Sequence, residues 1–270
     1  MSALNEPTFA WEPLTPRGVA AFARASLERL WVVQAIFAAL ATAGLVWFLS
    51  DGIFPVVTTV VGQLPEQGEI RTGKLDWRNE SPVLLAENDL LAVSVDLEHG
   101  GQLRSPADFQ LEFGRESVRV FSLFGEGELF YPAEYRMAAN RRDVRPAWGA
   151  WSPNILALAA IGTFFGLLLV WAVLATVYAL PVWLVCFFWN RDLNFLASWK
   201  LAAASLMPGA LLMSVALVLY EQHVFDLVQF GFAVGMHFVL GWIYLFVSPM
   251  FLKRVRPAAK QNPFADAAKN

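Results

Sequence analysis

The chain has 270 residues, of which 57% are hydrophobic and 16% are charged. Soluble domains carry about 25% charged residues, so this composition excludes an ordinary soluble protein. The net charge of −3 offers no basic surface for nucleic acid, and no nucleic-acid partner is expected. The single cysteine, Cys186, excludes a disulfide framework and a CxxC metal or redox pair, and we expect a small buried hydrophobic residue there.

The N-terminal part predicts a tail followed by a membrane anchor. Residues 1–29 carry scattered charges and prolines and are assigned to a cytoplasmic tail. Residues 30–50 form the first transmembrane helix, in which Gln34 is the one clearly polar side chain before Ser50. About 20 such residues, at about 1.5 Å each, cross a hydrocarbon core of about 30 Å. Residues 51–65 are apolar but contain prolines, and we interpret them as an interfacial continuation of this helix.

Composition changes sharply in residues 66–150, where polar and apolar residues alternate with a period of two. This period is typical of β-strands with one buried face. In residues 108–122 the alternation continues on both sides of Gly114, which predicts a hairpin. The segment is therefore interpreted as a small β-rich domain outside the cytoplasm.

Residues 151–252 contain the second, third and fourth transmembrane helices. Trp148 and Trp151 come just before the second one and are expected in the aromatic belt at the membrane surface. Residues 155–189 lack charge, and as a helix they would measure about 52 Å. This length favours one long helix, and an arrangement of two separate elements is the alternative. The third helix is placed at about residues 201–220 and the fourth at about 227–252, so the fold class is a membrane α-helical bundle of about four spans with an inserted β-rich domain.

Basic residues predict which side of the membrane each segment occupies, because they concentrate in short cytoplasmic segments. Both tails (1–29 and 253–270) and the loop before the third helix carry them: Arg17, Arg24, Arg29, Arg191, Lys200, Lys253, Arg254, Arg256 and Lys260. The connector 221–226 has none. Both termini are therefore predicted to be cytoplasmic. Four arginines in residues 136–145 lie on the side predicted to be external, which is opposite to what this rule expects. Long translocated domains, however, largely escape the rule.

Small residues four positions apart occur in three of the predicted helices. Such spacing lets helix backbones approach closely in lipid, where apolar helices gain nothing by leaving water. The predicted packing positions are Gly162, Gly166, Ser205, Gly209, Gly231 and Gly235.

The Pro208-Gly209 pair predicts a break in the third helix, and two readings stay open. A broken helix can expose carbonyls to an ion or substrate, as in transporters, or it can be a packed kink. Transport usually also needs ionisable groups at membrane depth. Only His237 lies well inside a span, with Gln34 as a neutral polar companion, so the packed kink is favoured.

Catalytic motifs for hydrolysis, nucleotide binding or dinucleotide binding do not occur in the sequence. Glu221, His223 and Asp226 are metal ligands by type and form a weak candidate site. Three polar residues in a short connector between apolar helices are nevertheless expected without a metal. We therefore predict no enzyme activity and no cofactor.

The layout resembles an uncharacterised bacterial family of multi-spanning membrane proteins, remotely similar to the Yip-type family. The motifs that carry this resemblance are Leu64-Pro65 with GEIRTGKL at residues 68–75, and SWKLAAASLMPGALL at residues 198–212. The resemblance implies a bacterial inner-membrane protein with an extracytoplasmic β-rich domain. It implies no catalytic residues.

The leading hypothesis is a non-enzymatic membrane protein whose external domain binds a protein partner or an envelope component. Alternatively, the partner is a second copy of the same chain, which would make the protein a homo-oligomer. Membrane lipids are expected around the helices. The second hypothesis is a transporter or lipid-handling subunit that uses the Pro208-Gly209 break and His237. An enzyme that uses the 221–226 connector is third.

Overall fold

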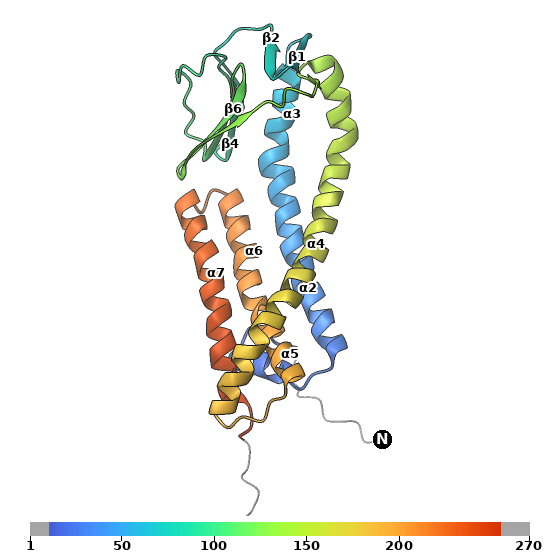
Figure 1. The fold of residues 1–270 in the computed structure, drawn as a ribbon, viewed down its shortest axis with the longest axis vertical. Helices are drawn as coiled ribbons and strands as arrows, with labels where there is room; N and C mark the ends of the chain where they lie inside the picture. The colour runs from blue at the N-terminus through green and yellow to red at the C-terminus, as the bar shows by residue number, and fades with distance from the viewer. Residues whose placement is uncertain (1–10, 255–270) are drawn as a thin grey trace, which may run out of the picture. The chain divides into compact units, whose positions relative to one another are not determined.

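The computed structural model describes residues 11–254 of the chain. Four helical stretches in this part are long and apolar enough to cross a membrane: Leu27–Gln63, Arg141–Phe188, Phe195–Glu221 and Leu227–Phe251. Two small β-sheets come between the first and the second stretch (Figure 1). The four apolar helices and the inserted β-rich segment that hydropathy predicts are both confirmed.

The chain divides into two compact units. Within the described residues, the first unit comprises residues 11–38, 166–211 and 236–254, and the second comprises residues 39–165 and 212–235. Each of the long apolar helices contributes residues to both units.

The first unit is entirely helical apart from its connecting segments. Its elements are α1 (Pro16–Phe22), the first part of α2 (Leu27–Trp47), the last part of α4 (Arg141–Phe188), α5 (Phe195–Ser205), the start of α6 (Met207–Glu221), the last part of α7 (Leu227–Val247) and the 3-10 turn η2 (Ser248–Phe251).

Helix α1 corrects the assignment of residues 1–29 to a tail. The Thr15 hydroxyl accepts a hydrogen bond from the Gly18 amide, and Pro16 occupies the first turn, where its missing N–H costs nothing. Val19 and Phe22 of this helix are fully buried. A cap followed by an apolar run is a helix signal, and burial of this run attaches the segment to the protein. Residues 1–10 of the tail and residues 255–270 of the C-terminal tail lie outside the described residues.

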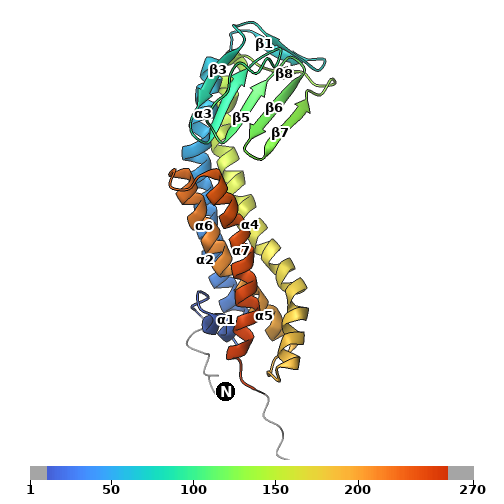
Figure 2. The same ribbon diagram turned by 90° about the vertical axis from the view of Figure 1, so that its left-hand side faces the viewer.

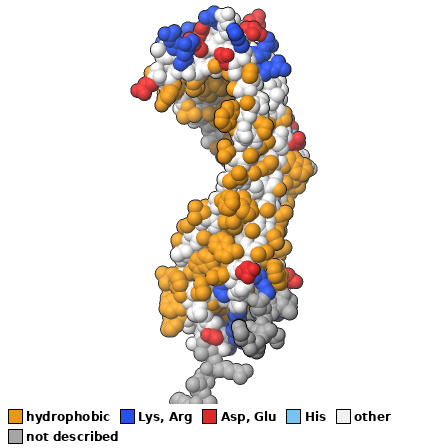
Figure 3. Space-filling model, turned by 90° about the vertical axis from the view of Figure 1, so that its right-hand side faces the viewer, with side chains coloured by type: hydrophobic (Ala, Val, Ile, Leu, Met, Phe, Trp, Pro, Cys, Tyr) orange, Lys and Arg blue, Asp and Glu red, His pale blue; other side chains and the backbone are white. Residues whose placement is uncertain are grey.

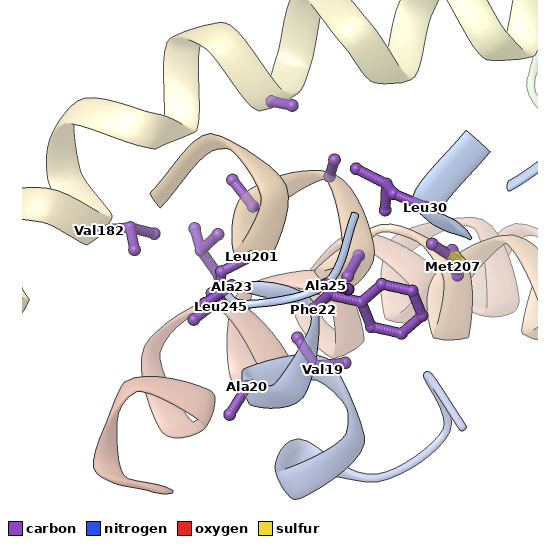
Figure 4. Packing of buried hydrophobic residues seen from close by; sticks show 14 of the residues in the cluster. Val19, Ala20, Phe22, Ala23, Ala25, Leu30, Val182, Leu201, Met207 and Leu245 are labelled. Atoms are coloured by element: carbon purple, nitrogen blue, oxygen red, sulfur yellow. The ribbon is translucent and has the colours of Figure 1, made fainter. Parts of the chain in front are cut away.

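The core of the first unit forms around the alanine-rich start of the third span. Leu201 and the three alanines that follow it are fully buried, and α5 packs against α1. Figure 4 shows Leu201 beside Ala23 and Leu245, with Val182 on one side and Phe22, Leu30 and Met207 on the other. Small side chains at the centre let α1 approach α5 closely, which explains why this stretch has so few bulky residues.

In the second unit, α2 continues through the π-helix η1 (Phe48–Ile53) into α3 (Phe54–Gln63). The predicted continuation of the first helix is thus present. Helix α3 also packs against strands β3 and β4 and buries Val56 and Val61, and its place at the membrane surface stays a prediction. A sheet with one apolar face needs such a cover, and α3 supplies it.

The second unit also contains eight strands in two sheets. They are β1 (Gly68–Arg71), β2 (Lys74–Trp77), β3 (Val83–Glu87), β4 (Leu91–Val95), β5 (Phe109–Phe113), β6 (Ser117–Ser122), β7 (Gly125–Phe130) and β8 (Met137–Ala138). One sheet has the order β2-β1-β8 and the other β3-β4-β5-β6-β7, which Figure 2 shows face-on. The predicted hairpin in residues 108–122 is confirmed as β5 and β6.

The pairing of β4 with β5 is parallel and was not expected from the sequence. Parallel neighbours need a crossover rather than a tight turn. Residues 96–108 form that crossover, and they bring His99 over the end of the sheet.

The core of the larger sheet lies between its apolar face and α3. Val56 of α3 packs with Leu85, Val93 and Val95 of the sheet. Charged side chains gather on the outer surface of the β-rich region, whereas hydrophobic side chains cover the helical surface (Figure 3).

Helix α4 begins at Arg141, nine residues before the predicted end of the β-rich domain at residue 150. Asn140 explains this earlier start, because its side-chain oxygen accepts a hydrogen bond from the Asp143 amide at 2.9 Å, as helix-capping residues do. The helix then runs unbroken to Phe188, so the prediction of one long helix over residues 155–189 is confirmed to within one residue.

Candidate functional site

The larger sheet has two edges, and only one of them is covered. Strand β3 lies at one edge and packs against α3. Strand β7 lies at the other and pairs only with β6 among the described strands. All six residues of β7 are exposed, and Phe130 exposes 72% of its surface. Proteins usually shield such an edge, so an open edge strand that ends in the exposed Leu129 and Phe130 marks a binding surface.

The hydrogen-bond register shows which β7 groups are available to a partner. The Tyr131 amide donates to the Glu116 carbonyl, so these two residues form a bonded pair across β6 and β7. Antiparallel pairs alternate, which directs the amides and carbonyls of Glu126, Glu128 and Phe130 away from β6. Three residues of β7 can therefore bond to an added strand.

A pocket of about 320 Å³ lies beside this edge. Its lining includes His99, Arg115, Glu116, Ser117, Glu128 and Phe130. Because Glu128 and Phe130 belong to β7, the pocket and the open edge form one continuous surface. We call this surface the edge site.

A chain of hydrogen bonds joins four side chains at the floor of the edge site. His99 Nδ1 lies 2.7 Å from Glu112 Oε1, and His99 Nε2 lies 3.1 Å from Ser117 Oγ. Ser117 Oγ donates to Glu128 Oε1 at 2.7 Å. A hydroxyl has one proton, so Ser117 accepts from His99 when it donates to Glu128. In this chain His99 Nε2 donates to Ser117, and Ser117 donates to Glu128.

The backbone at His99 is held in an unusual conformation to make these bonds. Its φ is +51°, in the left-handed region that histidine seldom adopts. The ring lies so close to Gly114 that a Cβ there would sit 2.0 Å from His99 Nε2. Gly114 is therefore required by contact with the imidazole.

The order carboxylate, imidazole and hydroxyl resembles that of a nucleophilic triad, but the geometry supports binding better. Ser117 is only 2% exposed, and its proton bonds to Glu128 rather than to His99. A general base has to accept the nucleophile's proton, which His99 Nε2 does not do here. The hydrogen bond from Ser117, assisted by Arg119, also holds the pKa of Glu128 below its usual value. The network therefore keeps a carboxylate charged at the surface.

The three weak metal candidates do not converge. Asp226 caps α7, where its Oδ1 accepts from the Gln229 amide at 2.7 Å. His223 lies 3.5 Å from Asp89, whereas Glu221 lies beside Asp51. In residues 11–254 no group of three or more histidine, cysteine or acidic residues is arranged to hold a metal.

The two tryptophans expected in the aromatic belt differ in their surroundings. Trp148 donates from Nε1 to Thr58 Oγ1 at 3.0 Å and packs on Phe54, so it attaches α4 to α3. Trp151 is exposed, as a residue among lipid headgroups would be.

The predicted small-residue positions also differ. Gly209 packs tightly, because a Cβ on it would lie 2.7 Å from the His237 carbonyl oxygen. Ser205 is fully buried. Gly231 would meet only the Phe124 ring at 3.6 Å, and Gly162, Gly166 and Gly235 have nothing within 4 Å of a Cβ. Packing at these last three positions stays a prediction, since a small residue permits close approach but does not cause it.

The predicted break at Pro208 is present, because α5 ends at Ser205 and α6 begins at Met207. A helix leaves its last four carbonyls without partners inside the helix. Here Gln34 Nε2 donates to the Ala203 carbonyl at 3.3 Å, and Ser205 Oγ donates to the Ala202 carbonyl at 2.7 Å. These bonds favour the packed kink over carbonyls that are open to an ion.

Sequence reasoning missed the edge site. His99 was not identified as a candidate, because the parallel pairing that brings it to Glu112 leaves no periodic signal. The open edge at β7 could have been suspected from the two large apolar residues, Leu129 and Phe130, that end an otherwise polar and glycine-rich strand.

The fold and the site together define a class of protein: a chain with four long apolar helices and a β-rich domain between the first and the second. No family model, curated protein or solved structure matches the chain. The resemblance to an uncharacterised bacterial family therefore stays a prediction.

Proposed function

We propose that the chain is a multi-spanning protein of the bacterial inner membrane that presents its β-rich domain outside the cytoplasm to bind another protein. The helices support the membrane part of this proposal. Large apolar side chains such as Leu158, Phe165 and Leu169 of α4 are more than half exposed. Lipid is the solvent in which such a surface is stable.

Four crossings place both termini on the same side of the membrane. The basic residues of both tails and of the loop before α5 favour the cytoplasm for that side. The β-rich domain then lies in the extracytoplasmic space, with β7 open to other envelope proteins.

The occupant that fits the edge site is an extended protein segment with basic side chains. An edge strand binds another strand through main-chain hydrogen bonds, and the outward amides of β7 provide three such positions. Glu126 and Glu128 are the only charged residues on β7. A partner strand with lysine or arginine opposite them is therefore favoured over a neutral one.

A second copy of the chain fits this edge less well. In an antiparallel pair of two β7 strands centred on Gly127, Glu126 of each copy lies opposite Glu128 of the other. Like charges directly opposite each other destabilise a sheet. The partner is therefore a different protein, and binding requires no catalytic step and no cofactor.

Photo-crosslinking in living cells tests this proposal. A photo-reactive amino acid replaces Phe130 on β7, and Glu80, which is exposed on the loop after β2, serves as the control position. Glu126→Pro removes one outward amide while leaving the ladder to β6 intact, and Glu126→Ala is its matched control. We expect a discrete adduct at residue 130 that persists in Glu126→Ala and is lost in Glu126→Pro. An adduct that survives Glu126→Pro, the absence of an adduct, or an adduct of two identical chains would contradict the proposal.

A further inference from the structure

A second pocket, of about 410 Å³, lies in the first unit between α1 and η2. Its lining consists of Arg17, Ala20, Ala21, Arg24, Phe251, Leu252 and Lys253. Three of these seven residues are cationic and none is acidic. We call this pocket the basic pocket.

The packing of α1 holds the cations of the basic pocket together. Arg17 and Arg24 are seven positions apart, which is about two helical turns, so both fall on one side of the α1 segment. Lys253 joins them because α1 packs against η2, which ends two residues earlier. The Arg17 guanidinium lies 5.4 Å from the centre of the Phe251 ring. Burial of Val19 and Phe22 on the opposite face keeps α1 in this place.

Three like charges around one cavity repel one another, and an anion bound between them removes that repulsion. Arginine is suited to this role, since its planar fork binds phosphate through two parallel hydrogen bonds. The pocket also has an apolar wall, because Phe251 lines it and Met250 beside it is half exposed. A ligand with a phosphate and a hydrocarbon part satisfies both surfaces.

We propose that the basic pocket binds the phosphate group of an anionic phospholipid, whose acyl chain lies along Met250 and Phe251. Basic pockets at the cytoplasmic ends of membrane helices bind such headgroups by the same chemistry. The inference rests on the proposed function, because it requires this end of the helices to lie at a membrane surface. A free phosphate compound has the same charged group but lacks the chain that the apolar wall would contact.

Native mass spectrometry of the full chain in mild detergent tests the proposal. The probes are phosphatidylglycerol, phosphatidylcholine of equal chain length, and inorganic phosphate. The variants are Arg17→Gln/Arg24→Gln and, separately, Lys253→Gln, all at exposed positions. Arg142→Gln, exposed near the start of α4, removes one positive charge elsewhere, as Lys253→Gln does at the pocket, and is the control.

We expect phosphatidylglycerol to bind at least about tenfold more tightly than phosphatidylcholine, and the double variant to lose about tenfold. Lys253→Gln should lose less, and Arg142→Gln should bind as the wild type does. Equal binding of the two lipids, or an unchanged double variant, would overturn the proposal. Inorganic phosphate that competes fully at equal concentration would assign the pocket to a soluble phosphate compound instead and would overturn the lipid part. Crosslinking at residue 130 is independent of these results, so failure of one proposal is distinguishable from failure of the other.

Discussion

Gly209 and His237 bring two apolar helices into backbone contact. A Cβ at residue 209 would lie 2.7 Å from the His237 carbonyl oxygen, which is closer than such atoms approach in proteins. The contact occurs at the third residue of α6, next to Pro208, where the third span is interrupted. The proline and the glycine therefore act together, because one ends the preceding helix and the other lets the new helix lie against α7.

This contact predicts the effect of Gly209→Ala. The added methyl group has to displace a backbone carbonyl, and we expect a loss of about 1–3 kcal/mol in the free energy of unfolding. Unfolding in mixed micelles with increasing SDS measures it. Gly162→Ala is the matched control, since nothing lies within 4 Å of a Cβ there, and helix propensity should make it neutral or stabilising by up to about 1 kcal/mol. Equal losses in both variants would show that the close approach is not present.

The bond between Gln34 and the Ala203 carbonyl is the second relationship that can be tested. Gln34→Leu leaves this buried carbonyl without its side-chain donor, and we expect a loss of about 1 kcal/mol. Val32→Leu, at an exposed position on the same helix, should change the stability little. A Gln34→Leu protein as stable as the wild type would mean that the carbonyl finds another donor at the break.

The buried pair of His99 and Glu112 should dominate the stability of the β-rich domain. Glu112 is 1% exposed, so His99→Asn leaves its buried carboxyl group without the hydrogen bond to the imidazole and should cost about 1–3 kcal/mol. Asparagine is chosen because it tolerates the left-handed backbone at this position. The double variant His99→Asn/Glu112→Gln should recover part of the loss, since an amide is less costly to bury than a charge. Thermal unfolding followed by circular dichroism measures both, and a double variant less stable than His99→Asn alone would contradict this explanation.

Tyr131 predicts a loss of stability at alkaline pH. Burial raises the pKa of its phenol above the ordinary value of 10.0, and its hydroxyl donates to the Gly114 carbonyl at 3.0 Å. A pKa that is raised in the folded state contributes stability that is fully present below the unfolded pKa and declines as the pH rises above it. We expect the melting temperature to fall above about pH 10 in the wild type. Tyr131→Phe should be less stable at neutral pH but should show a shallower decline, and an equally steep decline would assign the effect to other groups.

Hydropathy predicted the number and order of the apolar helices because each one is an uninterrupted apolar run, which depends on composition alone. The hairpin of β5 and β6 could also be predicted from the sequence, since the alternation of polar and apolar residues and the glycine at position 114 are local signals. The sequence also contains the capping residues Thr15 and Asn140, which mark the starts of α1 and α4. These two helix starts were not predicted, because the prolines near Thr15 and the tryptophans after Asn140 favoured other interpretations.

The rest depends on contacts that no local pattern encodes. Gly162 and Gly209 have the same kind of spacing, yet only Gly209 meets another backbone, because the neighbour is decided by how the helices assemble. The pairing of His99 with Glu112 follows from the parallel order of β4 and β5, and parallel order is a property of the whole sheet. The open edge at β7 likewise depends on the order of strands in the whole sheet, in which α3 packs against the opposite edge strand, β3.

Thiol labelling in intact spheroplasts tests the central claim, that four membrane crossings hold the β-rich domain outside the cytoplasm and the segment around α1 inside. Single cysteines replace Glu80 in the β-rich domain and Arg24 after α1, in a protein whose native Cys186 is buried and serves as the background control. We predict that a membrane-impermeant maleimide labels Glu80→Cys in intact spheroplasts and labels Arg24→Cys only after the membrane is permeabilised. Labelling of Arg24→Cys in intact spheroplasts, or protection of Glu80→Cys until permeabilisation, would contradict the account.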